Sequence, residues 1–303
     1  MSATEPSGPW QLELKQVVQE YPVKGAGWKR VLDSLDLRVP AGELVALVGP
    51  SGCGKSTLLR LLLGMELPRT GEVLVDGKHV VGPSRERGIV FQHYSLFPNL
   101  TVLDNVTYGL ELEEFTLLGK WVRYPRYRRR RKTFRSEAMH ALEKMRLAEH
   151  AHKYPFELSG GMRQRVAIAQ AMIMRPRLLM MDEPFGALDY TTRYDLQLYL
   201  LDNFYQTRMT VLFITHDLEE AVFLADRILV LSPYYVTDSG AANGSRFLLD
   251  ERVPFPHPRV LAIKKDPRFG ALLEQICELG LDPSRRQLYR ERGPGQSAGG
   301  DAS

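Results

Sequence analysis

The sequence predicts an α/β protein in which a helical insert interrupts a sheet-based core. Short apolar runs typical of strands occur up to Gln92 and resume at Arg177. The stretch between Gln92 and Gln164 has the composition of helices and loops, without strong strand runs. A core of strands and helices with an inserted helical subdomain at about residues 93–165 explains this order.

The strand candidates fall into two kinds. LELKQVVQEY and VLDSLDLRV alternate apolar and polar residues, which predicts an N-terminal antiparallel β-subdomain. GELVALVG is almost continuously apolar, as expected of a strand that is buried on both faces. Further candidates, in chain order, are GEVLVDG, GIVFQ, RLLMMDE, TVLFIT and RILVLS. We assign residues 10–232 to the main domain, 233–290 to a C-terminal extension whose role the sequence does not show, and 291–303 to a disordered tail.

The composition indicates a soluble protein of a reducing compartment. The 303 residues are 44% hydrophobic and 25% charged, which is ordinary for a globular chain. Two cysteines exclude a disulfide scaffold. The opening MSATEPSGPW lacks the features of a signal peptide, and no apolar run approaches the roughly 20 residues that span a bilayer. We therefore expect a cytoplasmic protein whose membrane role, if it has one, comes through a partner.

One segment of nine residues has the pattern of a phosphate-binding loop. It matches G-x-x-x-x-G-K-[ST] and lies between a predicted strand and the helical run KSTLLRLLLG, which ends at Gly64. Its glycines allow successive backbone N–H groups to face one anion at a helix N-terminus. The alternative interpretation is a glycine-rich turn with a surface lysine. The nine residues are Gly49, Pro50, Ser51, Gly52, Cys53, Gly54, Lys55, Ser56 and Thr57.

This loop predicts that the chain binds ATP and Mg²⁺. The ammonium group of Lys55 can reach the β- and γ-phosphates, and the Ser56 hydroxyl can ligate Mg²⁺. Asp182 ends an apolar strand and is suited to hold the metal shell. Glu183, one residue later, is the candidate for polarising the attacking water. An exposed acidic strand end before a proline is the alternative interpretation of these two acids.

The segment LSGGMRQR, residues 158–165, resembles the signature motif of ABC ATPases, and its spacing to Asp182-Glu183 is that of the family. The resemblance covers roughly residues 10–232. It implies the ABC ATPase fold, which has a P-loop NTPase core, an N-terminal antiparallel β-subdomain and an inserted α-helical subdomain. Other family elements occur in order. Gln92 resembles the Q-loop glutamine, Asp189 belongs to a D-loop, His216 resembles the switch histidine, and Tyr21 resembles the aromatic residue that stacks on adenine, with Trp28 as its rival.

Within the family, GPSRERGIVFQHYSLFPNLTVLDNV is similar to importers of the nitrate/sulfonate/taurine group. That resemblance implies a peripheral protein on the inner face of the cell membrane. Its expected partners are a second ATP-binding subunit, identical or a close paralogue, a transmembrane permease, and an external solute-binding protein that acts through the permease. The solute would be a small anion or organic acid. A soluble ABC ATPase that acts on nucleic acid and the ATPase of an exporter are the alternatives.

The resemblance also implies how two subunits would share each nucleotide. The signature of one subunit closes the ATP site of the other, so that its residues act in trans. Gln92 is expected to contribute to the Mg²⁺ site, while Lys55, Glu183 and His216 act in cis, by positioning and by stabilising charge. The residues expected to act in trans are Ser159, Gly160, Gly161 and Gln164.

A basic segment departs from the family pattern. KWVRYPRYRRRRKTFR, residues 120–135, holds nine Lys or Arg and no acid, and subtracting these charges from the net +4 leaves −5 for the rest of the chain. Four interpretations are open: a solvated or disordered loop, a contact with anionic lipid headgroups, nucleic-acid binding, and a regulatory or permease contact. We expect no nucleic acid among the partners.

Overall fold

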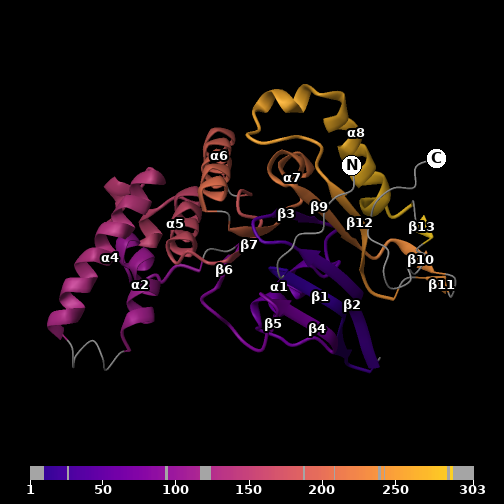
Figure 1. Ribbon diagram of the computed structural model, residues 1–303, viewed down its shortest axis with the longest axis horizontal. Coiled ribbons are helices and arrows are strands. Elements are labelled where there is room, and N and C mark those ends of the chain that lie inside the picture. The colour runs from indigo at the N-terminus through magenta and orange to yellow at the C-terminus, as the bar shows by residue number, and fades with distance from the viewer. Residues whose placement is uncertain are drawn as a thin grey trace. The chain divides into compact units, whose positions relative to one another are not determined.

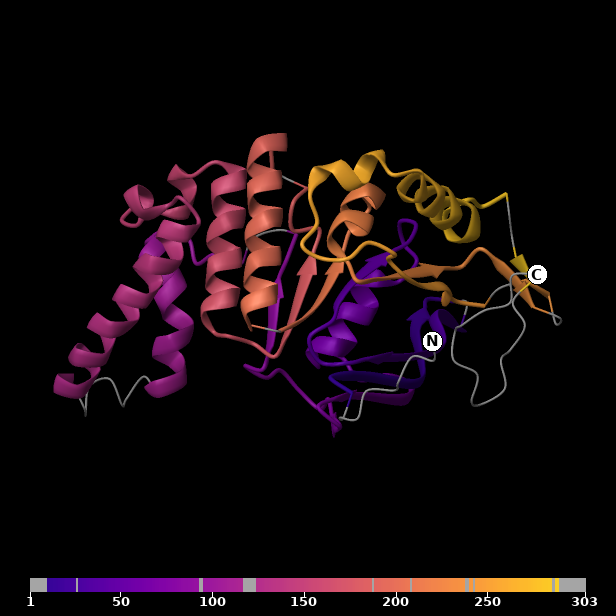
Figure 2. The same cartoon turned by 45° about the horizontal axis from the view of Figure 1, so that its top comes forward.

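The structure is a computed structural model, and it forms two compact units (Figures 1 and 2). Unit 1 is built from residues 1–84 and 208–303, and unit 2 from residues 85–207. The structure describes residues 10–25, 27–92, 95–116, 124–186, 188–207, 209–237, 240–241, 243–284 and 287–288.

Unit 1 begins with an antiparallel sheet in the order β2-β1-β4-β5. The alternating sequence of the first two strands is the reason for this half-buried sheet, because every second side chain turns to the core. Register shifts interrupt the pairing of β1 with β2 and with β4. The strands are β1 (Leu12–Val23), β2 (Gly27–Val39), β4 (Thr70–Val75) and β5 (Lys78–His79).

A second sheet in unit 1 has the strand order β12-β9-β3-β8. Its strand β3 runs parallel to both β8 and β9, and all five of its residues are fully buried. This burial explains its continuous apolar sequence. Helices α1 (Lys55–Leu63) and α7 (Leu218–Leu224) belong to the same unit. The strands are β3 (Leu44–Val48), β8 (Thr210–Ile214), β9 (Arg227–Ser232) and β12 (Arg246–Arg252).

The C-terminal extension folds onto unit 1. Helix α8 (Pro267–Ile276) contacts α7, and the π-helical turn η4 (Cys277–Leu281) contacts β9 and β12. At Gly280 this contact is so close that an added Cβ would overlap the side chain of Val230. The remaining elements are β10 (Tyr235–Thr237), β11 (Gly240–Ala241), β13 (Gln287–Leu288) and the 3₁₀ turn η3 (Leu261–Lys265). The predicted disordered tail, residues 291–303, lies outside the described residues.

Within its described residues, unit 2 combines two parallel strands with four α-helices and two 3₁₀ turns. Strands β6 (Arg87–Val90) and β7 (Leu178–Asp182) pair with each other. Helix α2 packs against both α4 and α5, and α2 and α4 run side by side in both views (Figures 1 and 2). Among the described helices of either unit, none is long and apolar enough to cross a membrane. The helical elements are α2 (Val102–Glu114), α4 (Tyr124–Lys144), η1 (Ala148–His150), η2 (Pro155–Glu157), α5 (Gly160–Ile173) and α6 (Tyr190–Thr207).

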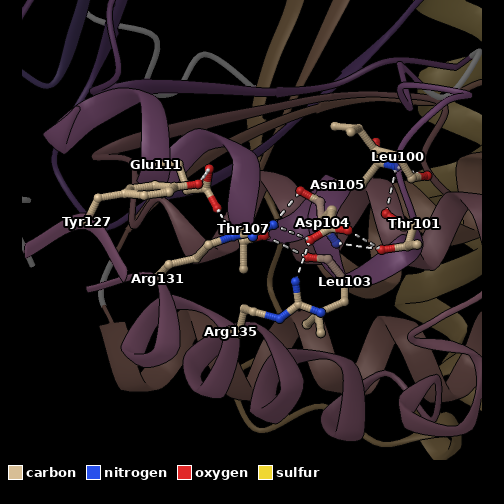
Figure 3. A network of polar contacts seen from close by, with 10 residues as sticks. All are labelled: Leu100, Thr101, Leu103, Asp104, Asn105, Thr107, Glu111, Tyr127, Arg131 and Arg135. Carbon is tan, nitrogen blue, oxygen red and sulfur yellow. Dashed lines mark hydrogen bonds and ion pairs between the residues drawn. The ribbon is translucent and has the colours of Figure 1, made fainter. Parts of the chain in front are cut away.

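Most of the basic segment is helical, so the loop interpretation of residues 124–135 is wrong. These residues open α4, and residues 120–123 lie outside the described part of the chain. Acidic side chains of α2 offset the repulsion along the basic helix. Arg131 donates from Nε to Glu111 at 2.9 Å, and Arg135 donates from Nη1 to Asp104 at 2.7 Å (Figure 3). The acids of α2 therefore reduce the repulsion among the arginines of α4, and burial of Phe134, Ala138 and Leu142 packs the helix in its unit.

A buried arginine fastens the C-terminal extension to α7. Arg259 is 3% exposed, and its guanidinium group donates to the carbonyl oxygens of Val222, Phe223 and Ala225 at the C-terminal end of that helix. It also donates twice to the carbonyl of Phe255, from Nε at 3.1 Å and from Nη2 at 3.0 Å. A cation at a helix C-terminus is favourable, and here it satisfies carbonyl groups that the helix leaves open.

Arg259→Met should therefore lower the free energy of unfolding by an amount on the order of 3 kcal/mol, because several buried carbonyl groups lose their donor. Chemical denaturation followed by circular dichroism measures this change. Arg268→Met is the matched control, since Arg268 pairs with Asp266 at the surface and its loss should leave the denaturation midpoint nearly unchanged. Equal stability of the two variants would show that the buried guanidinium group does not hold the extension.

Candidate functional site

The predicted phosphate loop follows β3 and ends at the first turn of α1. Lys55 folds back over the loop, and its Nζ donates to the carbonyl oxygens of Gly49 at 2.7 Å and Pro50 at 2.9 Å. Helix α1 has the left-handed Gly54 as its N-cap, no side-chain cap, and no acid in its first turn. Its first N–H groups are thus available to an anion, and a cation stands beside them. The loop fits a phosphate group.

Gly49 is required by the packing of this loop. A Cβ on Gly49 would overlap the carbonyl oxygen of Leu231 and come within 2.8 Å of the Cys53 sulfur. The sheet explains this close contact. Strand β3 lies between β8 and β9, and Val48 of β3 pairs with Val230 of β9, so Gly49 lies beside Leu231, the next residue of β9. Only a residue without a side chain fits there.

The side chains of the loop divide into an outer and an inner set. Ser51 and Ser56 are exposed, so the Ser56 hydroxyl is open to a metal ion. Cys53 and Thr57 are buried, and Thr57 accepts a hydrogen bond from Arg60 at 3.3 Å. Burial also raises the pKa of the Cys53 thiol above its ordinary value. Cys53 and Thr57 can therefore contribute only their backbone N–H groups to a phosphate.

Parallel strand register brings His216 to the same sheet edge as the phosphate loop. Leu47 of β3 pairs with Ile214 of β8, so Gly49 and His216 each lie two residues further on. His216 is exposed and precedes α7, whose N-cap Asp217 accepts from the Glu220 amide. The Glu220 carboxylate in turn accepts from Thr215 at 2.6 Å. Sequence analysis missed this D-x-x-E capping pattern, which fixes the backbone on both sides of the histidine.

The choice between Tyr21 and Trp28 is informed by the β1–β2 register. Tyr21 pairs with Lys29 and Pro22 pairs with Trp28, so the two aromatic side chains lie on opposite faces of the ribbon. Tyr21 is the one that contacts α1, since Arg60 donates to its hydroxyl at 3.1 Å. The hydroxyl also bonds to Glu66. Trp28 is 55% exposed and is covered on one face by Arg69. Sequence analysis did not identify Arg60 or Glu66 as the partners that orient Tyr21.

In unit 2, parallel register joins two further candidates. Val90 of β6 pairs with Met181 of β7, and two residues later the Gln92 amide Nε2 donates to the Glu183 carboxylate at 2.8 Å. These residues are 91 positions apart in the chain. Asp182, the residue before Glu183, ends β7 and is half-buried. The carboxyl ends of parallel strands thus present an amide and two carboxylates, which suit a hydrated Mg²⁺ ion and a water.

Glu183 has a left-handed backbone, with a φ of 46°. A residue other than glycine in this region costs about 1 kcal/mol or more, and such strain is concentrated at functional sites. The chain turns sharply here, and the amide of Gly186 donates back to the Glu183 carbonyl at 3.3 Å. The turn directs the carboxylate to Gln92 instead of continuing the strand.

The signature segment begins α5. Ser159 is its N-cap and accepts from the Met162 amide at 3.3 Å, and Gly160 and Gly161 form the first turn. Ser159 is exposed, as a contact in trans requires. Gln164 is 1% exposed, so its prediction as a trans contact is wrong: one turn into α5 its side chain faces the interior. Asp189 accepts from the Thr192 amide, which lowers the pKa of its carboxyl.

A phosphate loop after a buried parallel strand, with acidic residues at the end of another parallel strand, defines the class of P-loop nucleotide hydrolases. The comparisons with known proteins identify the family. A sequence profile described as "ABC transporter" matches residues 32–186. The chain belongs to this family and is one of its ATP-binding, ATP-hydrolysing cassettes, for which ATP and Mg²⁺ are the cofactors.

Relatives with named functions are similar over most of their length. A nitrate import ATP-binding protein of Synechocystis is 41% identical over 82% of this chain and 87% of the relative. A taurine import ATP-binding protein of Chromobacterium violaceum is 42% identical over 81% and 87%. An aliphatic sulfonates import ATP-binding protein of Bacillus cereus is 39% identical over 71% and 79%.

Solved structures confirm the predicted fold class. A dimeric bacterial ABC transporter cassette is 29% identical, with a TM-score of 0.67 over 81% of this chain and 100% of that one. A dimeric ATP-binding cassette in a post-hydrolysis state, bound to ADP and Pi, is 28% identical, with a TM-score of 0.66 over the same shares.

Tyr21→Ala should weaken ATP binding about 10-fold, because stacking of a base on an aromatic ring contributes roughly 1–3 kcal/mol. Tyr21→Phe keeps the ring and should bind ATP within a fewfold of the parent, and Trp28→Ala should leave binding unchanged. Equilibrium titration with a fluorescent ATP analogue measures all three. Loss of binding in Trp28→Ala, with Tyr21→Ala unaffected, would assign the stacking position to Trp28 instead.

Proposed function

We propose that this chain is the ATP-hydrolysing subunit of an importer that takes up a small anion or organic acid of the nitrate, sulfonate or taurine type. The similarity to three import ATP-binding proteins, each over more than two thirds of both chains, carries the proposal. The subunit would act from the inner face of the cell membrane. Its partners would be a second ATP-binding subunit, transmembrane permease subunits and an external solute-binding protein.

The residues at the strand ends support a division of chemical roles. Backbone N–H groups of the loop after Pro50, up to Thr57, would bind the phosphates, and the Lys55 ammonium would leave its carbonyl partners for the β- and γ-phosphates. Ser56, Gln92 and Asp182 would hold Mg²⁺, which supplies charge neutralisation when bound. Glu183 would accept the proton of the attacking water, and His216 would donate to the γ-phosphate.

The signature would act across a dimer. The exposed Ser159 hydroxyl and the first N–H groups of α5, at Gly160 and Gly161, form an anion-binding end of that helix. We propose that they bind the γ-phosphate held by the second subunit. Asp189, which is exposed and whose carboxyl pKa is lowered by the hydrogen bond from Thr192, would face the same partner.

In the complex reconstituted with its permease and binding protein, solute should raise kcat for ATP several-fold, because binding-protein docking favours the closed dimer. Nitrate, taurine and an alkanesulfonate should be compared with an amino acid and a sugar. A complex with Glu183→Gln should bind ATP normally but show no stimulated turnover, since the base is missing. Stimulation by none of the anions would contradict the proposed substrate class, and turnover by Glu183→Gln would remove that residue from its role.

Mixed dimers test the action in trans. Ser159→Arg should block closure of the partner's site, and Lys55→Ala should disable its own phosphate loop, so each homodimer should be inactive. A mixed dimer holds one composite site, with the Ser159→Arg subunit's intact loop facing the Lys55→Ala subunit's intact signature. This mixed dimer should occlude one ATP, whereas the unmutated dimer should occlude two.

Occlusion and phosphate release are both measured on dimers purified with two different affinity tags. Occlusion without release would show that the two sites hydrolyse only together, with the signature still acting in trans. Absence of both signals in a verified mixed dimer would contradict the trans assignment.

A further inference from the structure

The basic helix α4 has two faces that differ in their partners. On the inner face, four arginines pair with acidic residues of α2, and Tyr127 donates to Glu111 at 3.0 Å. Figure 3 shows Tyr127 and two of these arginines, Arg131 and Arg135. Phe134, Ala138 and Leu142 are buried on this side. The inner face is therefore electrically satisfied, and it is the face that holds α4 in unit 2. The four arginines are Arg126 and Arg130 on Glu114, Arg131 on Glu111 and Asp104, and Arg135 on Asp104.

The outer face carries Arg128, Arg129 and Lys132, all exposed. Their spacing of three and four residues places them on one side of the helix. Within the part of the chain that the structure describes, no carboxylate pairs with any of the three. An open hollow on the surface is lined by these three cations, by Tyr124 and Pro125, and also by Arg131 and Arg135, whose guanidinium groups pair with acidic residues of α2.

The three outer cations do not stabilise the folded subunit. Arg128 with Lys132, and Arg129 with Lys132, are like-charge pairs at i,i+4 and i,i+3, and such pairs each destabilise a helix by a few tenths of a kcal/mol. The acidic residues of α2 that lie nearby already form ion pairs with the inner arginines. An external anion would convert this local repulsion into attraction, so the arrangement favours a bound, multivalent anionic partner.

We propose that Arg128, Arg129 and Lys132 form a docking face for the anionic lipid headgroups of the membrane that surrounds the permease. This inference rests on the proposed function, since a permease brings the subunit to the bilayer. Arginine and lysine both bind phosphate oxygens, and basic side chains close to an anionic membrane add to each other's effect.

The composition of the outer face favours lipid over a protein partner. A stable protein interface has an apolar, desolvated centre, but Phe134, Ala138 and Leu142 of α4 are buried on its inner face, and the hollow consists of cations apart from Tyr124 and Pro125. Headgroups require cations and tolerate a hydrated surface. Tyr124, one turn before Arg128, is 58% exposed, and tyrosine is a residue that occupies the interface between lipid and water.

Vesicle flotation with the full chain tests the proposal. Vesicles of phosphatidylcholine with 30% phosphatidylglycerol should bind the chain, vesicles of phosphatidylcholine alone should not, and salt should weaken the binding. The variant Arg128→Gln, Arg129→Gln, Lys132→Gln should bind about 100-fold more weakly, at roughly fivefold for each cation. The control Lys24→Gln, Lys78→Gln, Lys265→Gln removes three exposed lysines from dispersed positions, and it should bind like the parent.

Three outcomes would overturn the lipid assignment. One is that the control variant loses as much vesicle binding as the triple variant, which would show that only the net charge of the chain matters. Another is tighter binding to duplex DNA than to the anionic vesicles at the same salt. The third is loss of permease assembly by the triple variant in neutral detergent, which would indicate an acidic protein partner. Solute-stimulated ATP turnover in detergent should be the same in the parent and both variants, so a failed vesicle experiment leaves the importer function standing.

Discussion

The close contact between Gly49 and the carbonyl of Leu231 is the constraint on which the phosphate loop depends. Strand β3 is enclosed by β8 and β9, and the chain that leaves it has no room for a side chain at this level. The loop consequently binds through its backbone, and Lys55 is held by backbone carbonyls of the same loop. A site built from main-chain groups of a buried strand end is rigid, and it presents its N–H groups in advance of the ligand.

The strands and their ends were predictable from sequence, whereas their pairing was not. Short apolar runs predicted β3, β7, β8 and β9, because burial on both faces leaves a composition that can be read locally. The hydrogen bond between Gln92 and Glu183 depends on which strands are neighbours and in what register, and no local pattern encodes this. Sequence analysis supplied the two residues separately, Gln92 from the family resemblance and Glu183 from its place at a strand end, and the parallel register of β6 and β7 is the physical reason that they meet. The left-handed conformation of Glu183 has no sequence signal, since glycine or asparagine is the residue expected there.

The errors of the sequence analysis have one physical cause, which is dependence on distant partners. Residues 124–135 read as a loop because they have little apolar periodicity, and their helix is supported by acids of α2. Gln164 was assigned to the nucleotide because motifs carry residue types without the direction of each side chain. The preference for Tyr21 over Trp28 stays a prediction, to which the register adds that the two side chains lie on opposite faces of β1 and β2.

The C-terminal extension connects to the same elements that carry the phosphate loop and the histidine. Asp226, at the start of β9, accepts from the Leu44 amide at the beginning of β3 and from His257 of the extension at 2.6 Å. Burial would raise the pKa of the Asp226 carboxyl, but the hydrogen bonds from His257 and Leu44 outweigh it and hold the pKa below its ordinary value. Arg259 of the extension binds the carbonyl groups at the C-terminal end of α7, the helix that follows His216. His257 of the extension binds Asp226, which in turn accepts from the first residue of β3. The residues after Ser232 are therefore hydrogen-bonded both to Asp226, next to β9, and to the end of the helix that follows His216.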